Sequence, residues 1–256
     1  MARVKVREFD KVGLCRPDPA ESSDAGVVSL GVFDGDDDPI HARLHRLQAG
    51  EQVTWRHSGP GHLAYVWDGQ VTVGGHVLSA ADTFLIEHGA GVTATAAEPA
   101  TLLLFTLRAD HARSQKAGGH VHLLHAGDAP SILLGEEGQI SVTLYADSGC
   151  PDCELWLHGN DFHQPGHVTD PHYHTEDEVI IVTAGEILLG KRAFGRGTAI
   201  AVQKDTIYGF SAGPDGLSFI NFRPSRPTYG QPGAGDPMDE RAFYAILPSP
   251  PRTYVA

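Results

Sequence analysis

Two histidines and a glutamate stand close together in the segment PHYHTEDEVIIVTAG, residues 171–185. His172 and His174 are one residue apart, and Glu178 follows four residues later. Alternate residues of a strand project from one face, so the three side chains share a face if the strand stays regular. Two neutral imidazoles and one carboxylate suit a divalent first-row metal and leave coordination positions open. The segment therefore predicts a metal site, against the alternative of a polar strand end in a His-rich protein.

The elements that must position these residues are short β-strands. An apolar, β-branched run and the turn residue Gly185 follow Glu178, and similar glycine-bounded segments recur, such as GTAIAVQKDTIYGFSAG and LSFINF. None of them has a sustained 3.6-residue apolar period. The 30 glycines and 17 prolines also indicate many turns. We therefore predict an all-β sandwich or barrel.

A long internal repeat runs through the chain. The windows that begin at Gly50 and Gly166 align without a gap at a shift of 116 residues. The matched glycine pairs are Gly50 and Gly166, Gly69 and Gly185, and Gly74 and Gly190. A repeat of this length indicates two copies of one domain. We predict one domain at residues 1–110 and another at 111–256, with a connector at 109–120 and a Pro/Gly-rich tail that lies over the surface.

The spacing Gly166-x5-His172-x-His174-x3-Glu178-x6-Gly185 resembles the complete first signature motif of the cupin superfamily. The doubled domain is similar to a bicupin, and the resemblance covers roughly residues 25–225. It implies two jelly-roll (double-stranded β-helix) barrels in one chain, with a metal inside the C-terminal barrel. The implied metal ligands are His172, His174 and Glu178.

The second motif of that superfamily is eroded here. Gly197 matches, but Gln203, Asp205 and Ala212 replace the expected proline, glycine and asparagine, and Tyr208 replaces the last histidine ligand. The metal then has three protein ligands, or Tyr208 or another histidine completes the shell. Tyr208 is also a candidate catalytic proton donor or base, because its pKa would fall beside a cation. The alternative is an aromatic side chain that fills the barrel.

The N-terminal copy has lost most of the motif. The residues that take the places of His172, His174, Glu178 and Tyr208 are Arg56, Ser58, His62 and Val92. Only one possible ligand remains, so we expect a degenerate site without metal. That barrel is expected to be structural, with a small-molecule site as the alternative.

Composition narrows the classes of partner. The net charge of −13 argues against nucleic acid and anionic membranes as partners. The N-terminal sequence has no apolar core of a signal peptide, so we expect a cytoplasmic protein. Cys150 and Cys153, in CPDC, are interpreted as a turn with two reduced thiols. A homodimer is left open.

Other polar residues are further candidates for the site. His158, His163 and His167 precede the motif, and each reaches the metal or the substrate, or lies at the surface or behind the ligands. The cations Lys191, Arg192 and Arg223 contact an anionic substrate or lie on solvated strand edges, and the second reading is favoured.

Three functional hypotheses follow, and whether the protein is an enzyme stays open among them. The leading one is a metal-dependent enzyme acting on a small organic molecule, an iron(II) dioxygenase by resemblance to oxygen-using cupins, with Zn, Mn, Ni or Cu as other metals. The second is a redox-neutral isomerase, dehydratase or lyase with Tyr208 as proton carrier. The third is a non-catalytic bicupin that binds a small molecule.

Overall fold

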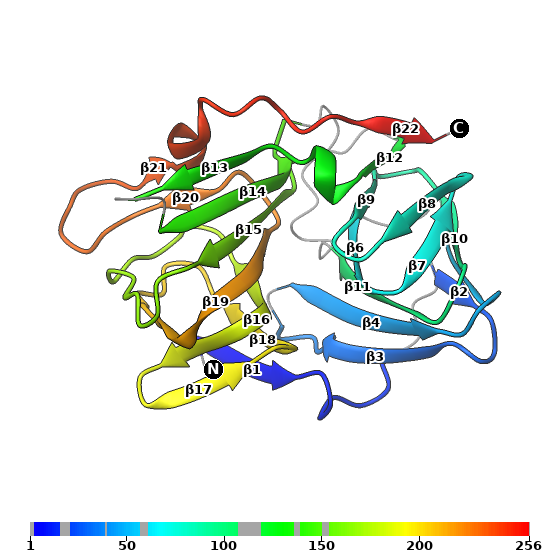
Figure 1. The fold of residues 1–256 in the computed structure, drawn as a ribbon, viewed down its shortest axis with the longest axis horizontal. Helices are drawn as coiled ribbons and strands as arrows, with labels where there is room; N and C mark the ends of the chain where they lie inside the picture. The colour runs from blue at the N-terminus through cyan, green and yellow to red at the C-terminus, as the bar shows by residue number, and fades with distance from the viewer. Residues whose placement is uncertain are drawn as a thin grey trace. The chain divides into compact units, whose positions relative to one another are not determined.

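A computed structural model describes residues 3–15, 21–38, 40–56, 61–106, 119–135, 139–149 and 154–255. The regular structure in these ranges is β-strand apart from short 3-10 turns, of which η1 (Ala126–Asp128) and η3 (Glu240–Tyr244) are drawn as coils (Figure 1). The prediction of an all-β protein is confirmed. No helix in the described ranges has the length and apolar character needed to cross a membrane.

Contacts divide the chain into two compact units, each described by itself below. The N-terminal unit contains Val12–Ala129 and Pro251–Ala256, and the C-terminal unit contains Met1–Lys11, Pro130–Cys150 and Glu154–Pro250. The first residues of the chain therefore belong to the C-terminal unit, and the last residues belong to the N-terminal unit. Most of the connector predicted at 109–120 lies outside the described residues.

The N-terminal unit is built from two antiparallel sheets. One sheet has the order β2 (Glu21–Ser23), β5 (Gln52–Trp55), β10 (Val92–Ala96), β7 (Gln70–Val73), β8 (His76–Ser79). The other has the order β22 (Thr253–Val255), β12 (Val121–Leu124), β9 (Thr83–Ile86), β6 (His62–Asp68), β11 (Ala100–Thr106), β4 (His41–Leu47), β3 (Val28–Phe33). Alternate apolar residues of both sheets, among them Trp55 and Phe84, form one buried core, as a two-layer β fold requires.

The C-terminal unit is organised around two long strands. Its sheet has the order β1 (Val4–Glu8), β18 (Thr198–Val202), β16 (Glu178–Leu189), β19 (Ser211–Arg223), β15 (Trp156–Phe162), β14 (Ile140–Asp147), β13 (Ser131–Leu134), with β17 (Arg192–Gly195) beside β16. The pairing of β16 with β19 shifts register twice, which lets these strands bend around the core. A small hairpin of β20 (Thr228–Tyr229) and β21 (Met238–Asp239) precedes η3.

The repeat seen in the sequence coincides with shared turn geometry. Five pairs of positions related by the 116-residue shift have positive φ in both units: Gly50 and Gly166, Gly69 and Gly185, Gly74 and Gly190, Ala81 and Gly197, and Gly89 and Asp205. At two of these positions a side chain is also excluded by lack of space. A Cβ on Gly69 would lie 2.1 Å from the Pro99 oxygen, and one on Gly185 would lie 2.3 Å from the Gly216 oxygen.

Candidate metal centre

The two motif histidines lie on a short bridged segment that precedes β16. His172 pairs with Tyr208, with N–O distances of 2.9 and 3.0 Å in the two directions, and its ring centroid lies 5.1 Å from that of His174. The chain then bends, and Glu178 is the first residue of β16. The strand is therefore interrupted, yet Glu178 Oε2 still lies 3.7 Å from His174 Nε2. All three side chains are buried.

Backbone carbonyls fix the orientation of both imidazoles. His172 Nδ1 lies 2.8 Å from the Asp170 carbonyl oxygen, and His174 Nδ1 contacts the Thr228 carbonyl oxygen. A carbonyl accepts a hydrogen bond and cannot donate one, so each Nδ1 carries the proton. Each Nε2 is then the basic nitrogen. This is the arrangement that outer-shell partners impose on metal-ligating histidines.

Glu178 is an ionised carboxylate, and one of its two oxygens accepts no hydrogen bond from the described residues. Its Oε2 accepts a hydrogen bond of 2.7 Å from Asn221 Nδ2, whereas its buried Oε1 has no hydrogen-bond partner among the described residues. Burial by itself raises the pKa of Glu178, but His174, Arg223 and hydrogen bonds from Tyr208 and Asn221 outweigh burial and lower the pKa to about 2. A charged, buried oxygen without a donor is suited to a cation.

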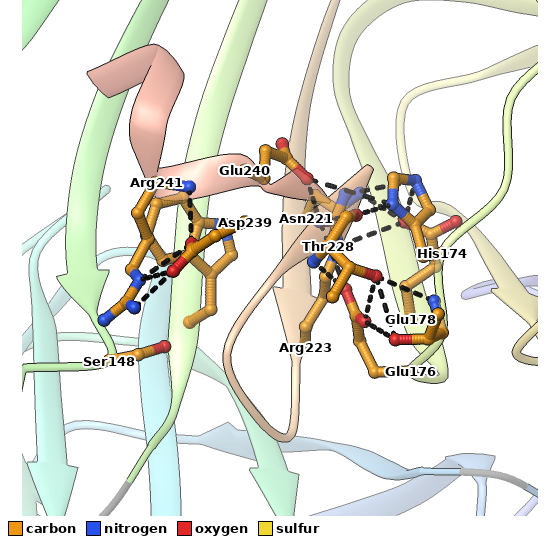
Figure 2. A network of polar contacts seen from close by, with 12 residues as sticks. Ser148, His174, Glu176, Glu178, Asn221, Arg223, Thr228, Asp239, Glu240 and Arg241 are labelled. Carbon is orange, nitrogen blue, oxygen red and sulfur yellow. Dashed lines mark hydrogen bonds and ion pairs between the residues drawn. The ribbon is translucent and has the colours of Figure 1, made fainter. Parts of the chain in front are cut away.

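A buried arginine lies against the same residues. Arg223 Nη2 is 3.2 Å from His174 Nε2, and Arg223 Nε is 3.5 Å from Glu178 Oε2. Its Nη1 contacts Glu240 and lies 3.4 Å from Glu176 Oε1 (Figure 2). Burial alone would lower the pKa of Arg223, but the charges of the three glutamates outweigh burial, so the pKa is raised overall and the guanidinium is cationic. The preference for a solvated strand edge at Arg223 is therefore wrong.

Tyr208 faces the same cavity, with its hydroxyl 3.4 Å from His174 Nε2. Burial, followed by the charge of Glu178, raises the pKa of Tyr208 well above its ordinary value. The positive charge of Arg223 acts in the opposite direction but is outweighed. In this state the hydroxyl is a hydrogen-bond donor.

The donors fit a divalent cation by type and by hydrogen bonding. As they stand, no group of three or more His, Cys, Asp or Glu side chains in the described part of the chain is arranged to hold a metal ion. The guanidinium of Arg223 lies against two of the three predicted ligands, His174 and Glu178. Metal binding by this set therefore requires Arg223 to move away from His174.

The site opens into a cavity of about 660 Å³ in the C-terminal unit. Polar residues among those that line it include His158, His172, His174, Tyr208, Asn221, Arg223 and Glu240. The segment after β19 lines the cavity with Tyr229, Met238, Phe243 and Tyr244, among others. The prediction that this tail lies over the surface is wrong for Glu240, which is buried.

Of the other candidate residues named from the sequence, His158 lines the cavity, whereas His163, His167, Lys191 and Arg192 are not among its lining residues. His158 is buried in the cavity wall, and burial lowers its pKa to about 4, so it is neutral. His163 lies 3.2 Å from Ser141 Oγ at an exposed position, and His167 packs its ring on Phe162. Lys191 and Arg192 are exposed. Sequence reasoning missed Glu240, whose only signal was an acidic residue in the tail.

In the N-terminal unit, the position equivalent to Glu178 is buried and hydrogen-bonded. His62 Nδ1 lies 3.0 Å from Thr106 Oγ1, and Val92 packs on the core of that unit. Arg56 reaches Ser22 Oγ at 3.5 Å. Ser58, like Cys150 and Cys153, lies outside the described residues.

Comparison with known proteins identifies the fold. No family model and no curated protein matches the sequence. Among solved structures, the protein YlbA from E. coli is 13% identical, with a TM-score of 0.65 over 86% of this chain and 90% of that one. A Cupin 2 conserved barrel domain protein from Leptotrichia buccalis is 15% identical, with a TM-score of 0.57 over 86% and 96% of the two chains.

A third match names an enzyme. Oxalate decarboxylase from Lactobacillus farciminis is 12% identical, with a TM-score of 0.61 over 95% of this chain and 90% of that one. At such low identities these likenesses establish the fold and do not carry activity across. The chain has the all-β jelly-roll fold of the cupins, as its first motif predicted.

Proposed function

We propose that this chain is a metal-dependent enzyme of the cupin type that acts on a small organic molecule, with a divalent metal held by His172, His174 and Glu178. One observation carries the proposal. Both imidazoles have Nδ1 tied to a carbonyl, which leaves Nε2 as the basic nitrogen at a buried cavity, beside a carboxylate whose Oε1 has no hydrogen-bond partner among the described residues.

Within this proposal, the leading reaction is dioxygenation with iron(II). Bound Fe(II) supplies the oxygen chemistry, and two histidines with one carboxylate are the ligand set typical of non-heme iron oxygenases. The chain itself supplies a largely apolar cavity wall against which the reacting molecule would pack. Tyr208 lines this cavity with its hydroxyl 3.4 Å from His174 Nε2, so the substrate would lie against it.

A redox-neutral isomerase, dehydratase or lyase is the second candidate, with Zn, Mn, Ni or Cu as further metals. The protonated, buried hydroxyl of Tyr208 favours it, because such a group can give a proton to a substrate and take it back. A binding protein without catalysis is the third candidate and would need only the cavity.

Elemental analysis of protein made without a His-tag tests the metal. We expect about one divalent metal per chain, lost in the double variant His172→Ala/His174→Ala and retained in the control His163→Ala/His167→Ala. Retention in the first variant would place the metal elsewhere. Oxygen uptake by iron-loaded protein with a panel of phenols and enols then separates the candidates: uptake that depends on His172 and His174 supports a dioxygenase, and turnover without uptake supports the redox-neutral reaction.

A further inference from the structure

We propose that Arg223 is a displaceable counter-ion of the metal site, and that its displacement by the metal tightens residues 228–244, a segment that we call the strap. The strap contains β20, β21 and η3 and lines part of the cavity. The inference rests on the proposed metal site and deepens it by naming what regulates metal occupancy. It is carried by the contacts that one buried guanidinium makes on its two sides.

The guanidinium of Arg223 has one side against the predicted ligands and another against carboxylates outside the ligand set. On the first side, Nη2 lies 3.2 Å from His174 Nε2, and Nε lies 3.5 Å from Glu178 Oε2. On the second side, Nη1 contacts Glu240 and lies 3.4 Å from Glu176 Oε1. The planar group is therefore shared between two sets of acceptors, and a metal competes for only one of them.

The metal and the guanidinium compete for the same atoms. The lone pair on His174 Nε2 serves either an N–H donor or a metal, but not both. A divalent cation at Glu178 also repels the positive charge of Arg223 at close range. A buried charge that loses its partners is strongly destabilising, so the displaced guanidinium has to keep the carboxylates that it already contacts. These are Glu240 and Glu176, which fixes the direction of the movement.

Both of these carboxylates are buried and tied to the strap. Glu240 lies in η3, and Glu176 accepts hydrogen bonds of 2.8 Å from Thr228 N and 2.7 Å from Thr228 Oγ1 (Figure 2). Once Glu178 no longer shares the guanidinium, Arg223 has two acidic partners in place of three. Charge-assisted hydrogen bonds of this kind are among the strong ones in proteins, and fewer acceptors then share one cation. We therefore expect the strap to open less often when metal is bound.

The coupling is reciprocal, because a metal that stabilises the strap must itself be stabilised by the strap. Glu240→Gln removes one carboxylate from the second side of the guanidinium, so Arg223 is drawn more strongly to Glu178. The affinity for metal should then fall by about fivefold or more. Arg223→Met removes the competitor, and the affinity should rise by about the same factor.

Mn²⁺ titration of metal-free, full-length protein, with EPR detection of the free ion, measures these affinities. Because Glu240 Oε2 also lies 3.8 Å from His174 Nδ1, an effect through that ring has to be separated from an effect through Arg223. In the double variant Arg223→Met/Glu240→Gln, the loss of affinity caused by Glu240→Gln should disappear. An equal loss in both backgrounds, or no rise in Arg223→Met, overturns the proposal.

Asp239→Asn is the matched control for Glu240→Gln. Asp239 is the neighbouring carboxylate in the strap, is exposed, and pairs with Arg241 instead of Arg223. It also caps η3 by accepting a hydrogen bond of 3.0 Å from Arg241 N, a role that asparagine fills about as well. The affinity of this variant for Mn²⁺ should stay at the wild-type value. A loss as large as that in Glu240→Gln would assign the effect to the net charge of the strap and contradict the proposal.

Amide hydrogen exchange gives a second readout, which needs no substitution at Arg223. Saturating Mn²⁺ should slow the exchange of residues 228–244 in the wild type, and the slowing should be smaller in Glu240→Gln. Unchanged exchange in the wild type, or equal slowing in the two proteins, overturns the coupling. Mn²⁺ binding that depends on His172 and His174 without this coupling removes the present inference alone. Absence of Mn²⁺ binding in both the wild type and Arg223→Met removes the proposed metal site as well.

Discussion

Tyr208 is the residue at which the two enzyme candidates and the structural alternative can be separated. It occupies the position where the resemblance to the cupins implied a fourth histidine ligand, and its hydroxyl reaches His174 Nε2 at 3.4 Å. The sequence predicted that this side chain would lie at the site, because the spacing of the second motif survives although only Gly197 of its residues does. It could not predict that Arg223 and Glu178 would set the charge around the hydroxyl.

The substitution Tyr208→Phe removes the hydroxyl and keeps the ring. If the hydroxyl moves a proton, turnover should fall by about 10²–10⁴-fold, the usual contribution of general acid–base catalysis, while metal content stays normal. Steady-state kinetics and elemental analysis of the same sample measure both, with Tyr254→Phe in the N-terminal unit as control. Nearly unchanged turnover would mean that Tyr208 only fills space, and loss of metal would make it a ligand.

His45 in the N-terminal unit makes stability depend on pH. It is fully buried on β4, with Nδ1 2.9 Å from Ser29 Oγ. Burial, with smaller contributions from Arg43 and His62, lowers its pKa to about 3. Between pH of about 6.5 and about 3 the unfolded chain therefore binds a proton that the folded chain does not, so stability falls as pH falls through this window.

The variant His45→Gln should remove that part of the pH dependence. Between pH 7.5 and pH 5 the wild type should lose roughly 2 kcal/mol more unfolding free energy than the variant, at about 1.4 kcal/mol per pH unit below 6.5. Urea unfolding at the two pH values measures the difference. Identical losses in the two proteins would show that His45 is not held neutral by the fold.

Among the structural elements, the turns carry the repeat most faithfully. The sequence alignment matched glycines at three turns, and all six of these residues have positive φ. At a fourth turn the units differ in residue but share the backbone: Ala81 has φ 73°, and the equivalent Gly197 has φ 82°. The left-handed region costs a residue with a Cβ roughly 1–2 kcal/mol, so Ala81 is strained where Gly197 is not.

Ala81→Gly should therefore stabilise the N-terminal unit by roughly 1 kcal/mol, and Gly197→Ala should destabilise the C-terminal unit by about as much. Space does not oppose the second change, since the nearest atom to a new Cβ is 3.5 Å away, on Phe9. The neighbouring Ala80 is not among the positive-φ residues, so Ala80→Gly should be neutral or destabilising. Thermal unfolding tests all three, and stabilisation by Ala80→Gly as well would refute the argument from φ.

The segment after β19 is the element that sequence reasoning placed least well. Its composition, rich in proline and glycine, predicted a surface tail, and composition describes the local chain without saying what the chain covers. Glu240 and Tyr244 are buried because Arg223, 17 residues before Glu240, provides a buried cation, and Trp156 provides a ring 5.6 Å from that of Tyr244. Such long-range pairs have no local signature.

At the scale of the whole molecule, the sequence predicted the all-β class and the cupin fold. Strand periodicity, turn glycines and one complete motif are local signals, which explains their success. The arrangement of charge was out of reach, because Glu176, Glu178 and Glu240 share one arginine only after the chain has folded. The domain boundary and the homodimer left open at the start stay predictions.

We propose that His172, His174 and Glu178 hold a divalent metal once Arg223 withdraws. Anomalous diffraction from a crystal soaked in Mn²⁺ or Fe²⁺ tests it most directly. We expect one strong peak at about 2.0–2.3 Å from the two Nε2 atoms and the Glu178 carboxylate, with the guanidinium turned away from His174. A soaked crystal without a peak at these atoms, with Arg223 Nη2 still 3.2 Å from His174 Nε2, would contradict it.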